Sequence, residues 1–333
     1  MKNKSFRVLS IFDGIGGARQ ALKELNIDCR YYASEIDKYA IQVAKANHSD
    51  IEHIGDVKGI ELEDYWVFYN QNNDPMKNGG SFQNKIDLLI GGSPCQDLSI
   101  AKKNRKGLEG KRSGLFYEYL RILKEVKPKF FILENVASMS KASKNIITKE
   151  LFNIEPIMIN SALVTAQQRK RLYWVGKLVD GKYRQVKIEQ PEDKKIYLKD
   201  IVEEGFVDRV KSYCLDANYY KGGNLKSYFE KCRRQLVFNK PIRLGHFDKG
   251  GQGDRVYSIK GKSICLSANS GGKGARTGLY KIEGVARKLT ITECCRLQGF
   301  PDNYVSMVSN TQGYKALGNS FTVPVIKHLL KLI

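Results

Sequence analysis

The chain has 333 residues, of which 42% are hydrophobic and 27% are charged, as in an ordinary soluble globular protein. Its formal net charge of +21 at pH 7 is unusual and favours a polyanionic partner such as nucleic acid. The seven cysteines include no Cys-x-x-Cys pair, which argues against a disulfide framework and against a zinc site.

The length predicts one large domain with a smaller one beside it. The first residues lack the apolar run of a signal peptide, and no segment approaches the length of a membrane span. We therefore expect a cytosolic protein in a reducing compartment.

Residues 7–12 are predicted to form a buried strand that runs into a glycine turn at residues 13–17 and then into a helix. This order is typical of a nucleotide-binding unit, because glycines let the main chain approach a ligand. The next two apolar segments end at Glu35 and Asp56, and an acidic residue about 20 positions after the turn suits ribose hydroxyls. The pattern favours an adenosine ligand but does not distinguish NAD from S-adenosylmethionine.

A fourth strand, residues 86–90, stops at two glycines and is followed by Ser93-Pro94-Cys95-Gln96. Open α/β sheets bind ligands at the carboxyl ends of their strands, so the Cys95 thiol is expected at the edge where a ligand would bind. A buried structural cysteine is the alternative. Polar residues 74–83 are predicted to form a loop before this strand, and basic residues 100–113 a loop after it. That second loop could cover a phosphodiester backbone or simply be solvated.

Glu134 ends another predicted strand, residues 130–133, and is a candidate acid on the same edge as Cys95. A helix-capping carboxylate is the alternative. Further on, Gln167, Arg169 and Arg171 alternate between predicted strands and could face an anionic substrate or an exposed edge.

The character of the chain changes at about residue 177, where Gly, Lys, Tyr and Asn become frequent. Residues 211–218 and 262–269 resemble each other and each precede a basic, glycine-rich turn, which suits two strand-turn units in DNA grooves unless the match is chance. Residues 287–304 then predict a helix with a Thr cap that ends at Gly299, and Gly313 is predicted to lie in a turn before the final helix.

Taken together, these motifs resemble the DNA cytosine-C5 methyltransferase family of bacteria and phages. The matching segments are Phe12-Asp13-Gly14-Ile15-Gly16-Gly17, Pro94-Cys95-Gln96, Glu134-Asn135-Val136, Gln167-x-Arg169-x-Arg171, Arg296-Leu297-Gln298-Gly299-Phe300-Pro301 and Gly318-Asn319-Ser320. The resemblance covers residues 7–176 and 286–333. Residues 177–285 fall where the family keeps its variable target-recognition region.

The resemblance implies an α/β fold of the class I S-adenosylmethionine-dependent methyltransferases: a Rossmann-like mixed sheet flanked by helices, with a smaller, irregular, β-rich recognition domain. It implies a catalytic and cofactor-binding domain at residues 1–176, a target-recognition domain at 177–285 and a returning segment at 286–333. Phe321 departs from the family pattern, which usually has a smaller aliphatic residue there, so we expect different packing near the cofactor.

The resemblance also assigns roles by position. The implied catalytic residues are Cys95, Glu134 and Arg169. The implied S-adenosylmethionine residues are Phe12, Asp13, Gly14, Gly16, Glu35, Ile36, Asp56, Val57, Pro94, Asn319 and Ser320. The implied DNA-binding residues are Gln96, Ser99, Arg171, Lys221, Lys273 and Arg276.

The implied reaction is sequence-specific methylation of cytosine in double-stranded DNA, with base flipping, no metal, and S-adenosylhomocysteine as the product. The resemblance further implies a monomer, possibly one with a separate cognate restriction endonuclease. Two alternatives stay open: methylation of a tRNA cytosine, and a DNA-binding module without catalytic activity.

Overall fold

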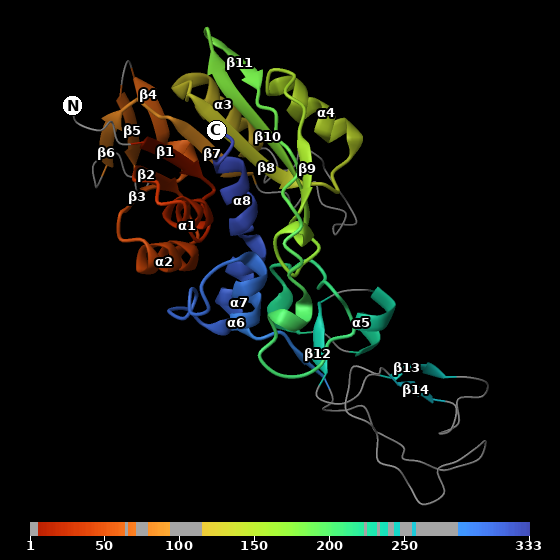
Figure 1. The fold of residues 1–333 in the computed structure, drawn as a ribbon. Helices are drawn as coiled ribbons and strands as arrows, with labels where there is room; N and C mark the ends of the chain where they lie inside the picture. The colour runs from red at the N-terminus through yellow and green to blue at the C-terminus, as the bar shows by residue number, and fades with distance from the viewer. Residues whose placement is uncertain are drawn as a thin grey trace, which may run out of the picture.

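The computed structural model describes residues 6–63, 66–70, 79–93, 115–222, 225–231, 234–238, 243–246, 255–257 and 286–333. Within these residues an eight-stranded sheet forms the centre of the molecule, in the order β11-β10-β8-β7-β1-β2-β3, with β9 paired to β10 (Figure 1). Its strands are β1 (Phe6–Ile11), β2 (Cys29–Ser34), β3 (Ile51–Gly55), β7 (Leu88–Gly92), β8 (Phe130–Val136), β9 (Ile157–Asn160), β10 (Lys170–Val179) and β11 (Lys182–Gln185). The predicted α/β class is confirmed.

The five central strands are parallel, while β9, β10 and β11 add antiparallel pairings at one side. From β1 the chain proceeds outward to β2 and β3, and it then returns to β7 on the other side of β1. The sheet order therefore reverses between β1 and β7. In open α/β sheets the crevice at such a reversal, outside the carboxyl ends of the strands, is where ligands bind.

Helices cover both faces of this sheet. They are α1 (Gly17–Glu24), α2 (Lys38–Asn47), α3 (Leu115–Val126), α4 (Lys141–Glu150), α6 (Ile291–Gln298), α7 (Asn310–Asn319) and α8 (Val323–Leu330). Apolar side chains of α1, α2 and α8 share one core, and those of α3 and α4 share the other. The β1 side chains alternate between them, because successive residues of a strand point to opposite faces: Val8 lies in the first core and Leu9 in the second.

A small antiparallel sheet lies between β3 and β7 in sequence and was not predicted. It consists of β4 (Ile60–Glu63), β5 (Trp66–Asn70) and β6 (Gly79–Gln83). Its inner residues Val67 and Phe82 join the second core, and the Phe82 ring stacks on Tyr32 at 3.7 Å. The predicted loop at residues 74–83 is therefore wrong for residues 79–83, because alternation over so short a strand is hidden by its glycines and polar residues.

Residues 177–285, which the resemblance assigns to target recognition, begin inside β10 and include β11 of the central sheet. Their other described helix and strands are α5 (Leu225–Lys231), β12 (Leu236–Phe238), which pairs with β15 (Ala286–Lys288), and the pair β13 (Arg243–His246) with β14 (Arg255–Tyr257). Residues 211–218 do not form a strand-turn unit; they form a single bridge, between Ser212 and Gln167, and then a turn. Residues 100–113 and 262–269, for which a loop and the second unit were predicted, lie outside the described residues.

The C-terminal segment returns to the central sheet, and α8 lies beside α1 (Figure 1). Thr290 caps α6 in a reciprocal capping box with Glu293, and Gly299 ends the helix in the left-handed conformation, as predicted. The turn predicted at Gly313 is wrong, because Gly313 lies inside α7 and the chain turns only at residues 320–322. Glycine is tolerated there because it packs closely on Ile291 and Val305.

Among the described helices none combines the length and apolar character that a membrane span requires. Across the same residues no group of His, Cys, Asp and Glu side chains is arranged to hold a metal ion.

The pairing of β1 with β7 gives a first test of the fold. A Cβ at Gly91 would lie 2.7 Å from the main-chain oxygen of Ile11, so we expect Gly91→Ala to reduce the free energy of unfolding by about 1–3 kcal/mol through overpacking. Arg30→Ala on the neighbouring strand β2 is the control, because Arg30 is exposed and a surface substitution usually changes stability by no more than about 0.5 kcal/mol. Denaturant unfolding in which both variants lose equally would contradict this account.

Candidate functional site

The turn after β1 lies at the point where the sheet order reverses. Phe12, Gly14 and Gly16 all have positive φ angles, of 58°, 63° and 77°. For Phe12 this conformation is strained, and strain of this kind collects where backbone geometry serves a function. A Cβ at Gly14 would meet no atom within 4 Å, so the turn has open space in front of it among the described residues. The turn can therefore accept a ligand against its backbone.

Glu35 follows β2 directly and is held by main-chain amides. Its Oε2 accepts a hydrogen bond from Gly14 N at 2.9 Å, and its Oε1 accepts from Ile36 N and Asp37 N at 2.8 Å each. The carboxylate thus fixes the turn after β1 to the end of β2. The neighbouring Ile36 side chain is 73% exposed, which is unusual for a large apolar residue and leaves a flat apolar surface at the strand end.

Asp56 occupies the matching place after β3. Its Oδ1 accepts a hydrogen bond from Lys58 N at 3.1 Å and caps the 3-10 turn Val57–Gly59, while the Val57 side chain is buried. The open glycine turn, the Glu35 carboxylate, the apolar Ile36 and this second carboxylate form a donor and acceptor set that fits an adenosine-containing cofactor.

Asp13 lies in the turn but points into the protein. Its Oδ1 accepts hydrogen bonds from the hydroxyls of Ser10 and Tyr31, both at 2.6 Å, while its buried Oδ2 has no partner among the described residues. Burial raises the pKa of Asp13 to about 6. The carboxyl therefore titrates near neutral pH beneath the turn.

The C-terminal segment supports the same turn from a distance in sequence. Tyr304 donates a hydrogen bond to Ile15 O at 2.9 Å, and its oxygen lies 2.9 Å from His48 Nε2, which is then the donor. Burial lowers the pKa of His48 to about 4, so its imidazole is neutral at physiological pH.

Phe321 packs between the turn after β1 and the end of β7. A Cβ at Gly17 would lie 3.3 Å from Phe321 Cβ, and one at Gly92 would lie 3.1 Å from its ring. The Phe321 ring therefore fills the space above these two glycines, and this is the form that the expected difference in packing takes. It follows Asn319, which is exposed, and Ser320, which is buried.

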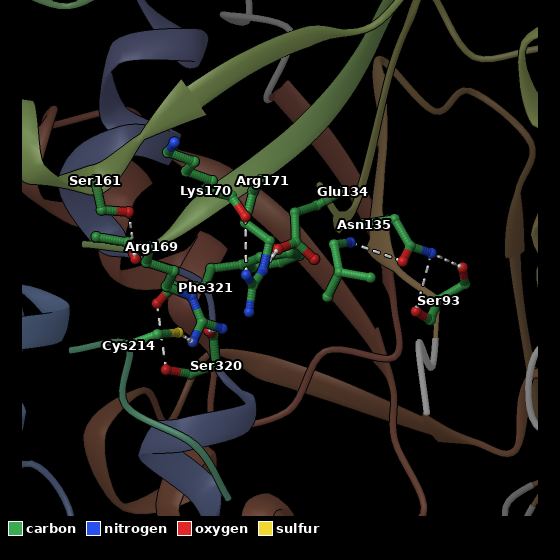
Figure 2. Close-up of polar contacts among 12 residues, drawn as sticks. Ser93, Glu134, Asn135, Ser161, Arg169, Lys170, Arg171, Cys214, Ser320 and Phe321 are labelled. Carbon is green, nitrogen blue, oxygen red and sulfur yellow. Dashed lines mark hydrogen bonds and ion pairs between the residues drawn. The ribbon is translucent and has the colours of Figure 1, made fainter. Parts of the chain in front are cut away.

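Glu134 lies on β8, next to the end of β7. The pairing of the two strands places Gly92 opposite Glu134, and a Cβ at Gly92 would lie 3.0 Å from Glu134 Oε2. The other oxygen, Oε1, forms an ion pair with Arg171 Nε at 2.8 Å, with both side chains about 15% exposed or less. Figure 2 shows the Arg171 side chain directed toward Glu134.

The pairing of Glu134 with Arg171 differs from the predicted arrangement, which put Arg169 beside Glu134 and Arg171 on DNA. Arg171 lies within β10, which is hydrogen-bonded to β8, whereas Arg169 precedes β10 and turns away from Glu134 (Figure 2). The Arg169 guanidinium is only 4% exposed and donates to the main-chain oxygens of three residues: Leu215 at 3.1 Å, Gly318 at 3.2 Å and Ser320 at 2.9 Å.

Ser93 and Asn135 form a contact to which the sequence gave no role. Asn135 Nδ2 donates to Ser93 Oγ at 3.0 Å, and both residues are buried (Figure 2). This bond fixes the last described residue of the β7 segment against the end of β8. The sequence signal that could have revealed this bond is Asn135 in the Glu134-Asn135-Val136 motif, because a buried Asn side chain needs a hydrogen-bond partner.

Six predicted site residues lie outside the described residues: Pro94, Cys95, Gln96, Ser99, Lys273 and Arg276. In sequence, Cys95 follows Ser93 by two positions. Lys221 is described and is exposed, at the end of the 3-10 turn Tyr219–Lys221 of the recognition region.

Comparison with known proteins agrees with this geometry. The family of C-5 cytosine-specific DNA methylases matches residues 6–333 of the chain. The type II methyltransferase M.HhaI of Haemophilus parahaemolyticus is 31% identical over 332 residues, which cover 97% of this chain and 92% of that protein. The type II methyltransferase M.HpaII of Haemophilus parainfluenzae is 31% identical over 353 residues, with 97% and 88% covered.

Solved structures share the fold. The methyltransferase EhMeth of Entamoeba histolytica superposes with a TM-score of 0.63 at 16% identity, over 99% of this chain and 98% of that one.

The buried carboxyl beneath the turn predicts a pH effect on stability. Because the pKa of Asp13 is higher in the folded protein than in the unfolded chain, its protonated form stabilises the fold at low pH. Relative to Asp13→Asn, the wild type should lose about 3 kcal/mol of unfolding free energy as pH rises from about 4 to above 6. Denaturant unfolding at a series of pH values measures this difference.

Asp180→Asn is the control for that series, because the Asp180 side chain is 87% exposed. It should show no comparable trend. A difference between wild type and Asp13→Asn that does not vary with pH would show that Asp13 stays ionised.

Proposed function

Because the chain belongs to the C-5 cytosine-specific DNA methylase family, we propose that it transfers a methyl group from S-adenosylmethionine to carbon 5 of a cytosine flipped out of duplex DNA. The observation that carries this proposal is the Glu134–Arg171 ion pair at the end of β8. It lies next to the β7 end that leads to Cys95 and close to the open turn after β1.

Carbon 5 of cytosine is a weak nucleophile, so the ring must be activated. In the proposed reaction the Cys95 thiolate adds to carbon 6, which makes carbon 5 electron-rich. When bound, the cofactor supplies an electrophilic methyl group. Loss of the carbon 5 proton and of the thiol by β-elimination then restores the aromatic ring.

Glu134 would hold the base during these steps. We propose that Glu134 Oε2 shares a proton with N3, which takes that proton as negative charge builds on the ring, and that the exocyclic amine donates to the same carboxyl group, while Arg171 fixes Oε1. This makes Arg171 a positioning residue for the base site instead of the DNA contact that the resemblance assigned. Arg169, which is held by main-chain oxygens, would act through the surrounding structure and not on the base.

The cofactor would lie along the ends of β1, β2 and β3. We propose that the turn with Phe12, Gly14 and Gly16 contacts the cofactor through its main chain. Glu35 would accept hydrogen bonds from the ribose hydroxyls. The adenine would contact Ile36, Asp56 and Val57. Pro94, Asn319 and Ser320 would complete the pocket. The exposed Ile36 side chain and the open space at Gly14 support this placement.

Duplex DNA would be bound by the basic recognition region. A base stacked inside a duplex cannot be reached, and flipping it costs a few kcal/mol. Phosphate contacts, which the net charge of +21 favours, would offset that cost. We propose that Gln96, Ser99, Lys221, Lys273 and Arg276 take part, and that the enzyme acts as a monomer on DNA in the cytosol, with or without a partner endonuclease.

Transfer of tritium from labelled S-adenosylmethionine tests the proposed activity. We expect label on duplex DNA and none on tRNA, and we expect Cys95→Ala to abolish it because the nucleophile is lost. Cys29→Ala is the matched control, since it removes a buried thiol of β2 far from the proposed reaction.

Label on tRNA alone would favour the RNA substrate instead. Tight DNA binding without any labelling would indicate a binding module.

Substitution of Arg171 tests whether this residue positions Glu134 or contacts DNA. We expect Arg171→Lys to lower the single-turnover rate at saturating DNA by about 10²-fold, because a misplaced carboxylate loses its alignment with the base. Arg184→Lys is the control, since its ion pair with Asp180 spans 3.8 Å at the surface and contributes little. Weaker DNA affinity and a smaller salt dependence, with an unchanged rate, would instead assign Arg171 to a phosphate.

A further inference from the structure

Residues 212–215, which lie within the proposed recognition region, are hydrogen-bonded to the segment that precedes β10. Gln168 N donates to Ser212 O at 3.0 Å, and Ser212 N donates to Ala166 O at 2.8 Å. The next contact is to a side chain, because Leu215 N donates to Gln167 Oε1 at 3.1 Å. This part of the proposed recognition region is therefore fixed to the segment that leads into β10.

Gln167 extends these contacts to the C-terminal segment. Its Nε2 donates to Leu297 O at 2.8 Å and to Gln298 Oε1 at 2.9 Å. Thr322 also donates to Gln298 Oε1, at 3.0 Å. Since Gln167 and Gln298 are fully buried, each of these bonds replaces one to water and would be costly to leave unmade.

Arg169 connects the segment at Leu215 to the C-terminal segment at Gly318 through one guanidinium. Its Nη1 donates to Leu215 O, on the recognition side, and to Gly318 O, on the side of Asn319 and Ser320. Its Nη2 donates to Ser320 O (Figure 2). The planar fork of Arg can serve these separate acceptors at once, whereas a Lys ammonium is a single point.

Gly318 brings the same two segments into direct main-chain contact. A Cβ at Gly318 would lie 2.5 Å from Ala217 N and equally close to Asp216 O. No side chain fits between the end of α7 and the turn after Leu215. If either segment moved, the buried guanidinium would lose acceptors, and a buried charged donor is especially costly to leave unpaired.

We propose that Arg169 and Gly318 form a joint that couples the recognition region to Asn319 and Ser320, so that duplex DNA and the adenosyl cofactor strengthen each other's binding. The inference rests on the proposed function, because it takes Asn319 and Ser320 to lie at the cofactor and the recognition region to lie on DNA. Because neither segment can shift without the other, a ligand that holds one segment in place also holds the other, and the second ligand then meets a segment that is already positioned. Arg169 is a positioning residue in this arrangement.

Coupling of this kind is reciprocal, which makes it measurable from both directions. The affinity for S-adenosylhomocysteine is measured by equilibrium dialysis with and without sheared duplex DNA that accepts label in the transfer assay. The affinity for that DNA is measured with and without S-adenosylhomocysteine. The affinity for each ligand with the other present, divided by its affinity without the other, gives one ratio for each direction. For the wild type we expect the two ratios to agree and to reach about 5-fold or more.

We expect Arg169→Lys and Gly318→Ala to bring both ratios to within about twofold of one, because each variant disrupts the joint by a different route. Trp174→Phe is the matched control. It removes the buried hydrogen bond from Nε1 to Thr148 Oγ1, far from the joint, and should lower stability while leaving the coupling unchanged.

The proposal is overturned if the wild type shows no coupling, or if either joint variant folds and keeps the wild-type ratios. It is also overturned if Trp174→Phe abolishes the coupling as the joint variants do, because general destabilisation would then be the cause. If no DNA accepts label from the wild type, it is the proposed function that fails, and this outcome is seen before any ratio is measured.

Discussion

The side-by-side pairing of β1 and β7 is the constraint on which the candidate site depends. Both strands are parallel and buried, so their carboxyl ends emerge at the same edge of the sheet. The register brings Ile11 opposite Gly91, so close that only glycine fits. As a result the turn that carries Gly14 and the segment that leads to Cys95 begin next to each other. Glu134 is then one strand away, on β8.

Residues from the end of the chain complete this arrangement. Tyr304 bonds the turn after β1, Phe321 packs on Gly17 and Gly92, and Lys315 forms an ion pair with Asp37 at 2.7 Å. These contacts link residues separated by most of the sequence. The first and last segments therefore form one structural unit, and β11 also belongs to its sheet, so the part of residues 177–285 that lies outside this unit begins only after β11 (Figure 1).

The sequence predicted the parts of the fold that depend on local pattern. Strands ending in glycine or a carboxylate, the capping box at Thr290 and the glycine that ends α6 all have strong local signals. It missed the sheet β4–β6, whose strands are only four or five residues long, and it placed a turn at Gly313, where close packing and not a turn explains the glycine.

The two arginines show a different limit. Alternation of Arg169 and Arg171 shows that they share a side of an extended segment, but it does not show which neighbour each one meets. That depends on β10 pairing with β8 and on the C-terminal segment returning to Arg169, and both are long-range contacts. The Ser93–Asn135 bond was hidden for the same reason.

The main-chain contact at Gly318 also bears on how such enzymes could exchange recognition regions. A graft that replaced the whole of residues 177–285 would bring in a foreign segment where Asp216 and Ala217 now fit against α7 with no space to spare. A graft that begins after Gly222 and ends before β15 would leave that surface intact. The part of residues 177–285 that could be exchanged without disturbing this contact is therefore smaller than the whole range, and its boundary is set by packing.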